Sequence, residues 1–195
     1  MSRLKEQYKK EILPQLKSEL KFDNDFAVPR ILKIVVNAGI GKLLLAAPKN
    51  LENLRAALAK IAGQQPVITR AAKAIAGFKT REGQIVGLRA TLRGRRMYDF
   101  LDKFINVAMP RTRDFRGLSP RGFDGRGNYN CGIRENIVFP EVVEGGAEGA
   151  FGLEITIVTS AKNNEDAYKL LKKFGFPFGA VEDKAPKRAR RKAVR

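Results

Sequence analysis

The sequence contains no histidine and no tryptophan, and its only cysteine is Cys131. Without histidine, the side chain that most often acts as a general base near neutral pH is missing. A single cysteine cannot form an internal disulfide or a Cys-His catalytic pair, and a zinc site would need several more cysteine or histidine ligands. These absences exclude disulfide scaffolds, Cys-His catalysis and structural zinc sites, and we expect no metal or other cofactor.

The sequence also lacks a secretory signal and a long apolar run. Residues 1–6 include the charged residues Arg3, Lys5 and Glu6, and no apolar signal segment is visible at this end. No apolar run is long enough to span a bilayer, so no membrane-spanning segment is expected. A lone cysteine is typical of a reducing compartment. Together these features predict a cytoplasmic protein.

Acidic residues are scarce beside basic ones. The 195 residues include 38 lysines and arginines but only 20 aspartates and glutamates, a formal net charge of +18. This excess favours a polyanionic partner, with nucleic acid the first candidate and a membrane surface the second. Of the two we expect nucleic acid, and no membrane partner. Because 44% of the residues are apolar, the chain can form a substantial core. We expect one RNA-binding α+β domain over 1–180 and a basic tail over 181–195.

Hydrophobic periodicity predicts alternating helices and strands. The segment 2–20 has helical spacing, with Ser2 as a possible cap and Pro14 expected to kink or split the helix. Gly-rich residues 141–152 are expected to form a flexible turn. The expected fold is α+β: an antiparallel β-sheet with helices packed on one face, long basic loops and a disordered basic tail. Helices are predicted over 2–20, 48–62, 95–108 and 164–174, and strands over 28–37, 67–69, 84–93, 131–138 and 153–157.

Two predicted strands carry cations on one face. In 28–37, we place Leu32 with the apolar residues on the core side and Ile31 on the polar side. In 84–93, alternate residues are apolar and basic or hydroxylated. Side by side, these strands and 67–69 would form a basic, hydrogen-bonding platform for an RNA backbone, although an ordinary solvated face is the alternative. The residues expected there are Lys33, Asn37, Thr69, Arg89, Thr91 and Arg93.

The segment 70–83 is predicted to be a long basic loop between two strands. It places Arg70, Lys73, Lys79 and Arg81 around an apolar patch that contains Ile75 and Phe78. Exposed apolar residues at a loop tip favour a contact with another RNA over a merely solvated hairpin end.

The segment 110–130 has neither helical nor strand periodicity and alternates arginines with glycines and aromatics. Guanidinium groups suit phosphate oxygens, and aromatic faces such as those of Phe123 and Tyr129 can stack on unpaired bases. A solvated loop whose aromatics fold back into the core is the alternative, and we expect Phe115 in the core. Asp114 and Asp124 are interpreted as acceptors that order the loop. The arginines predicted to bind RNA are Arg111, Arg113, Arg116, Arg121 and Arg126.

The tail from Lys184 onward contains seven cations and no acidic residue. Such a segment is expected to be disordered when free and to become ordered on a polyanion. A localisation tract is the alternative interpretation.

Several motifs resemble the large-ribosomal-subunit protein five family in its bacterial form. They lie in 63–73, 75–79, 91–94, 110–129 and 139–141, and the resemblance extends from about Tyr8 to Phe178. The most specific are Phe-Arg-Gly-Leu at 115–118 and Phe-Asp-Gly-Arg-Gly-Asn-Tyr at 123–129. The chain departs from the family in having Ala72 where a basic residue is common, and in the tail after Val181.

The resemblance implies an α+β protein that binds 5S rRNA in the central protuberance of the large ribosomal subunit and has no enzymatic activity. It implies that the sheet face with Asn37, Gln64, Thr91 and Arg93 contacts 5S rRNA. It further implies that the loop 70–83, with Arg70, Lys73, Phe78, Lys79 and Arg81, reaches the peptidyl-site tRNA. Contacts with 23S rRNA, and an inter-subunit bridge with a small-subunit head protein, are also expected.

Two other classes of function fit the residues less well. A sequence-tolerant DNA-binding architectural protein fits the charge, but no helix-turn-helix, zinc finger or basic zipper is visible. An enzyme would have to use carboxylates, lysine, tyrosine or Cys131. The carboxylates of the central segment stand beside arginines, which argues against a catalytic pair.

Overall fold

The computed structural model describes residues 2–113, 115–143 and 150–179. Its centre is a five-stranded sheet with the order β2-β3-β1-β5-β4, in which all neighbouring strands are antiparallel. The sheet therefore agrees with the predicted fold class. The strands are β1 (Ile31–Gly39), β2 (Val67–Arg70), β3 (Ile85–Leu92), β4 (Tyr129–Ile133) and β5 (Leu153–Thr159).

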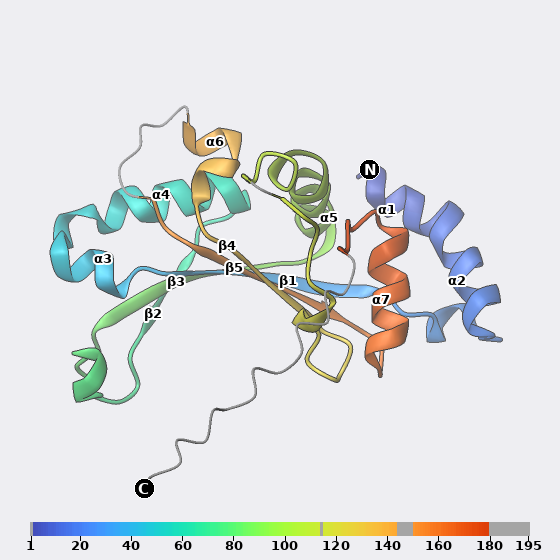
Figure 1. The fold of residues 1–195 in the computed structure, drawn as a ribbon, viewed down its shortest axis with the longest axis horizontal. Coiled ribbons are helices and arrows are strands. Elements are labelled where there is room, and N and C mark those ends of the chain that lie inside the picture. The colour runs from blue at the N-terminus through green and yellow to red at the C-terminus, as the bar shows by residue number, and fades with distance from the viewer. Residues whose placement is uncertain (1, 114, 144–149, 180–195) are drawn as a thin grey trace, which may run out of the picture.

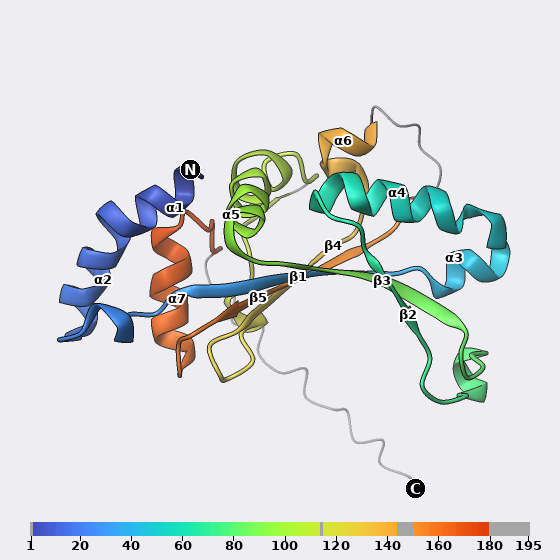
Figure 2. The same cartoon turned by 180° about the vertical axis from the view of Figure 1, so that it is seen from behind.

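Helices cover one side of this sheet and one of its ends. In Figures 1 and 2, α4, α5 and α6 lie on one side, while α1, α2 and α7 lie together at the end of the sheet. No described helix lies across the opposite side, which we call the open face. The helices are α1 (Arg3–Gln7), α2 (Leu13–Leu20), α3 (Gly41–Ala46), α4 (Leu51–Ala62), α5 (Gly94–Lys103), α6 (Pro140–Val143) and α7 (Asn164–Lys173).

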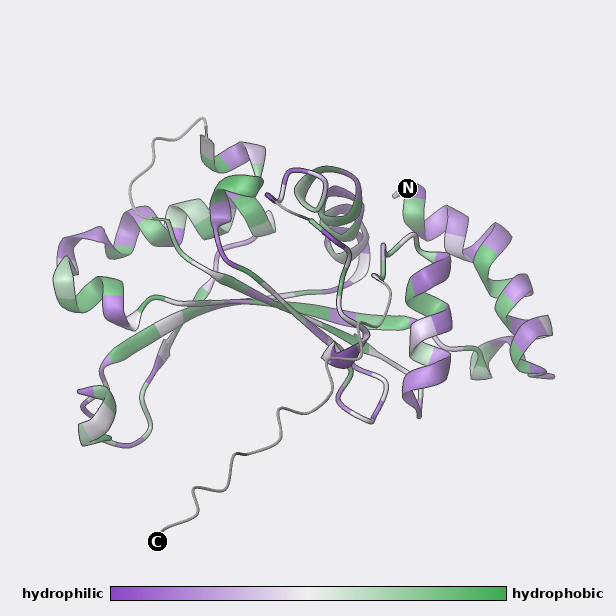
Figure 3. Cartoon of the chain, in the orientation of Figure 1, coloured by the Kyte–Doolittle hydropathy of each residue, from purple (hydrophilic) through white to green (hydrophobic). Residues whose placement is uncertain are grey.

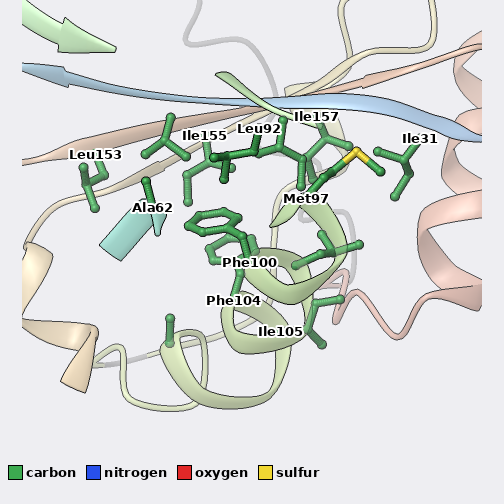
Figure 4. Packing of buried hydrophobic residues seen from close by; sticks show 14 of the residues in the cluster. Ile31, Ala62, Leu92, Met97, Phe100, Phe104, Ile105, Leu153, Ile155 and Ile157 are labelled. Carbon is green, nitrogen blue, oxygen red and sulfur yellow. The ribbon is translucent and has the colours of Figure 1, made fainter. Parts of the chain in front are cut away.

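The core lies between the sheet and α5. Alternate strand residues such as Ile34, Leu92 and Ile155 are fully buried because successive side chains of a strand point to opposite faces. Figure 4 shows Phe100 of α5 pointing toward this layer. Most of the opposite residues of these strands are half-buried or exposed. They include polar residues such as Asn37 and Arg89 together with the exposed Val67, so the open face is largely but not wholly polar.

The N-terminal helical segment accommodates Pro14 through a wider turn. A π-helical turn, Tyr8–Ile12, joins α1 to α2, and the N–H of Leu13 bonds to the carbonyl of Tyr8. Pro14 has no N–H and its ring would crowd the carbonyl four residues earlier in a regular helix. The predicted split therefore takes the form of a π turn rather than a break. Ser2 stands at the N-cap position, but its side chain makes no capping bond.

Three local predictions were wrong. Ile31 is buried and Leu32 is 43% exposed, the reverse of the expectation, because the pairing with β5 is irregular between Ile31 and Lys33. The predicted strand over 131–138 ends at Ile133, and a 3₁₀ turn, Asn136–Val138, follows it. Residues 141–143 belong to α6 rather than to a flexible turn. The remainder of that predicted turn falls partly on 144–149, outside the described residues, as does the basic tail.

Candidate nucleic-acid interface

The open face brings together residues from three strands that are far apart in the sequence. Asn37 of β1 stands directly opposite Arg89 of β3, and Val35 stands opposite Thr91. Thr69 of β2 pairs with Gly87, which places it on the same face. Arg93 follows β3 in an extended conformation at the N-cap of α5. The predicted platform is therefore assembled by the sheet.

The cations of this face have no ion-pair partner within the described protein. Arg89 and Arg93 are exposed and Lys33 is half-buried. None of the three takes part in a salt bridge with a described residue. Unpaired cations on one face keep their charge available for an external anion, whereas paired ones would already be partly neutralised.

Gln64 lies at the edge of this surface and connects three elements. It follows the C-terminal cap of α4, and its Nε2 donates a hydrogen bond to the carbonyl oxygen of Thr91 at 3.3 Å. Arg96 of α5 donates to its Oε1, also at 3.3 Å. Arg96 is a further exposed cation, and it contacts Gln64. It was not among the predicted interface residues, although it follows the predicted Arg93 by only three residues.

The loop 70–83 projects from the sheet on the side opposite α4 (Figures 1 and 2). An isolated bridge between Ile75 and Thr80 closes its tip, and Lys79 adopts a left-handed conformation with φ 53°. Phe78 is 74% exposed and Ile75 is 50% exposed. Figure 3 shows hydrophobic and hydrophilic residues side by side at this tip.

The cations of this loop are placed differently from one another. Lys73, Lys79 and Arg81 are exposed and make no salt bridge with a described residue. Arg70 is also exposed, but its Nη1 donates to the carbonyl of Gly83 at 3.0 Å and closes the base of the loop. Three of the four predicted cations are therefore available to a partner, and the fourth also has a structural role.

The central segment exposes its arginines and buries most of its aromatic surface. Phe123 lies 4.8 Å from Tyr129 between ring centroids, and Phe178 lies 5.5 Å from Tyr129. Tyr129 is fully buried, so the suggested base stacking by Tyr129 is wrong. Phe123 is half-buried and packs on Tyr129 and on Phe178, near the end of the described chain. Phe115 is packed against the core, as expected. The five arginines, Arg111, Arg113, Arg116, Arg121 and Arg126, are all exposed.

Asp124 orders the segment, as predicted. One carboxylate oxygen accepts the N–H groups of Arg126 at 2.8 Å and Asn128 at 3.0 Å, and the other accepts the side-chain amide of Asn128 at 2.7 Å. These bonds favour the charged form. The pKa of Asp124 is consequently lowered, with the Asn128 side chain as the largest cause. Asp114 lies outside the described residues.

Known ribosomal proteins match this sequence over most of its length. Residues 24–81 match the family model for ribosomal protein L5, and residues 85–178 match the separate model for the C-terminus of the same ribosomal family. A large ribosomal subunit protein uL5 from Halothermothrix orenii is 56% identical over 178 residues, which are 91% of this chain and 99% of that relative. The chain belongs to the ribosomal protein L5 family.

Other L5 relatives are similar over the same length. Proteins of the same name from Syntrophomonas wolfei and Desulfotalea psychrophila are each 52% identical over 178 residues, covering 91% of this chain and 99% of the relative. The family resemblance predicted from the motifs is therefore confirmed. Because L5 relatives are named as ribosomal proteins, a structural and non-enzymatic family, the prediction that this protein is not an enzyme is also confirmed.

The described part of this L5 chain has no grouping of three or more histidine, cysteine, aspartate or glutamate side chains that would hold a metal ion. Burial raises the pKa of the Cys131 thiol to about 12, which lowers the fraction of the reactive thiolate near neutral pH. Among the described helices, none has the length and apolar character needed to cross a membrane.

Glu154 is a polar residue of the open face that was not predicted there. It belongs to β5, pairs with Asn37 across the sheet and is exposed. The Nδ2 group of Asn37 donates to its Oε2 at 3.3 Å. Its alternation with Leu153 and Ile155 was visible in the sequence, but its position beside Asn37 depends on the strand order.

Proposed function

We propose that the protein binds 5S rRNA through the open face of its sheet. As a member of the ribosomal protein L5 family, it is a structural constituent of the large ribosomal subunit and acts within the ribosome in the cytoplasm.

The observation that carries the proposal is the set of unpaired cations on the uncovered side of the sheet. Lys33, Arg89 and Arg93 combine charge, access to solvent and the absence of an ion-pair partner among the described residues. Asn37, Thr69, Thr91 and Gln64 add hydrogen-bonding groups around them. Phosphate contacts by cations position a protein on RNA, and neutral polar groups can contact bases and sugars.

We further propose that the loop 70–83 contacts the peptidyl-site tRNA. Its support is the combination of reach, charge and exposed apolar area: the loop projects from the sheet (Figure 1), and its residues Phe78 and Lys79 are exposed. A projecting tip of this kind can contact a second nucleic acid while the open face holds the first. Family members commonly have a basic residue where this chain has Ala72, so the loop is less basic here.

The central arginines are assigned to 23S rRNA in this proposal. Arg111, Arg113, Arg116, Arg121 and Arg126 are exposed on a segment that Asp124 and the aromatic contacts hold in shape. A bridge to a small-subunit head protein rests on the family resemblance of the sequence. The basic tail, 181–195, is proposed to bind adjacent RNA.

Binding of purified protein to 5S rRNA and to scrambled RNA of equal length tests the main proposal. With roughly six phosphate contacts, affinity for 5S rRNA falls about a thousandfold between 50 and 200 mM salt. Equal affinity for both RNAs would refute specific 5S rRNA binding. Strong competition by duplex DNA would favour the DNA-binding alternative instead.

A pair of loop substitutions tests the division between the two surfaces. Lys79→Ala and Arg81→Ala are expected to leave 5S rRNA binding unchanged and to weaken crosslinking to peptidyl-site tRNA in assembled ribosomes. A large loss of 5S rRNA affinity in these variants would contradict the assignment of separate surfaces.

A further inference from the structure

The open face is not uniformly basic, and its charge changes sign across the sheet. Arg89 stands on one side of Asn37 and Glu154 stands on the other, because β1 lies between β3 and β5. Arg89 and Glu154 are thus two strands apart, about 10 Å across the sheet. A carboxylate on a surface that binds a polyanion would repel phosphate, so its presence calls for a different contact at this position.

Glu154 has no cation paired with it among the described residues, and it keeps free hydrogen-bond acceptor positions. It is exposed and forms no salt bridge with a described residue, even though the chain carries a formal net charge of +18. One of its oxygens accepts the Asn37 amide at 3.3 Å. An ionised carboxylate has about four acceptor positions, so several remain for an external donor.

The contact with Glu154 also determines how Asn37 is oriented. A carboxylate only accepts hydrogen bonds, so the amide must turn its Nδ2 group toward Glu154. The Oδ1 atom of Asn37 is then directed away from Glu154 and remains available as an acceptor. Glu154 and Asn37 therefore present two neighbouring acceptors, at a place where phosphate oxygens could supply no donor.

We propose that Glu154 and Asn37 recognise hydrogen-bond donors of an unpaired nucleotide, while Lys33, Arg89 and Arg93 hold the neighbouring phosphates. The inference rests on the proposed binding of 5S rRNA to this face. The donors are the ring N–H and exocyclic amine groups of a base, above all the adjacent N1–H and N2–H₂ of guanine, or a ribose 2′-OH. Glu154 is thus a specificity-determining residue within an otherwise basic surface.

The substitution Glu154→Gln distinguishes this proposal from simple charge repulsion, because the two predict opposite changes in affinity for 5S rRNA. If Glu154 only repelled the RNA, removing its charge would tighten binding. If it accepts donors from a nucleotide, Glu154→Gln weakens 5S rRNA binding by roughly tenfold or more, a typical effect for one lost base contact. Binding to scrambled RNA stays the same or improves, and the salt dependence for 5S rRNA is unchanged because no phosphate contact is lost.

Two further variants complete the comparison. Glu154→Asp keeps the carboxylate and should recover part of the lost discrimination, which a purely structural role would not require. Glu52→Gln removes the same charge from α4, on the helix-covered side, where the side chain is 75% exposed, and should leave discrimination unchanged. Thermal unfolding of each variant shows whether the fold is retained.

Modified RNAs identify the donor. Inosine in place of single unpaired guanines removes the exocyclic amine, and 2′-deoxy substitution removes the hydroxyl. At the recognised nucleotide, one of these changes should weaken wild-type binding but have little further effect on Glu154→Gln. Tighter or unchanged 5S rRNA binding by Glu154→Gln would overturn the inference. Failure of the wild-type protein to discriminate 5S rRNA from scrambled RNA would instead overturn the proposed function itself.

Discussion

Replacing the three unpaired cations of the open face tests the proposed interface quantitatively. The variant carries Lys33→Gln, Arg89→Gln and Arg93→Gln. Glutamine keeps much of the aliphatic length and removes the charge. Because these side chains are exposed or half-buried and make no ion pair with described residues, stability should change by less than about 1 kcal/mol. Any loss of binding then reports on the interface rather than on folding.

The expected magnitude follows from counterion release. Each phosphate contact contributes about 0.9 to the slope of log affinity against log salt for a duplex, and about 0.7 for single strands. Three lost contacts lower the slope by about 2 to 3. With roughly six contacts, the affinity of the wild type for 5S rRNA falls about a thousandfold when salt rises fourfold. The affinity of the triple variant falls only about fortyfold over the same range.

The assay is filter binding of 5S rRNA over a series of salt concentrations from 50 to 200 mM. The matched control carries Lys9→Gln, Lys10→Gln and Lys60→Gln, which remove the same charge from exposed helix positions away from the open face. The control is expected to keep nearly the wild-type slope, since long-range effects are screened within about 10 Å at 0.1 M salt.

Two results would refute the reasoning. If the triple variant kept the wild-type slope, its cations would not contact phosphates. If the control triple lost as much slope as the test triple, net charge alone would account for binding and the open face would have no special role.

Three further predictions concern the central segment and its surroundings. A Cβ added at Gly122 would clash with the backbone carbonyl oxygen of Asn130, so Gly122→Ala should destabilise the protein by about 1–3 kcal/mol in thermal unfolding; an unchanged midpoint would contradict this packing. The pKa of Asp124 is lowered from 3.8 by its hydrogen bonds, so its contribution to stability is present above pH 4 and is lost as pH falls through the lower, folded-state value. An NMR titration midpoint at or above 3.8 would contradict that sign. Burial raises the pKa of Cys131 from 9.0 to about 12, so at pH 8 the native thiol should react with a disulfide reagent more slowly than the same thiol after unfolding; equal rates would contradict the raised pKa.

Much of the fold could be predicted because local periodicity and packing agree. The stripe of Leu54, Leu58 and Ile61 is buried on α4, and Gly63 ends that helix with φ 64°, as expected for a left-handed cap. Asn163 caps α7 by accepting the N–H of Asp166. These features depend on neighbours a few residues apart, which a single sequence displays directly.

The errors occurred where a distant partner decides the outcome. Ile31 and Leu32 exchange faces because of an irregular pairing with β5, more than a hundred residues later in the chain. Phe123 and Tyr129 turn inward because Phe178 is available to pack on them. Short-range patterns contain no information about such partners, so the aromatics of the central segment were equally compatible with base stacking.

The amino-acid sequence alone determined the excess of positive charge, the absence of histidine chemistry, the amphipathic strands and the motifs of the L5 family, since each is a property of composition or of neighbouring residues. Only the tertiary structure decided that Arg89, Asn37 and Glu154 form one row, and that the loop tip with Phe78 projects away from the helices. Strand order and pairing register set these positions, and both arise from long-range packing that places β1 between β3 and β5.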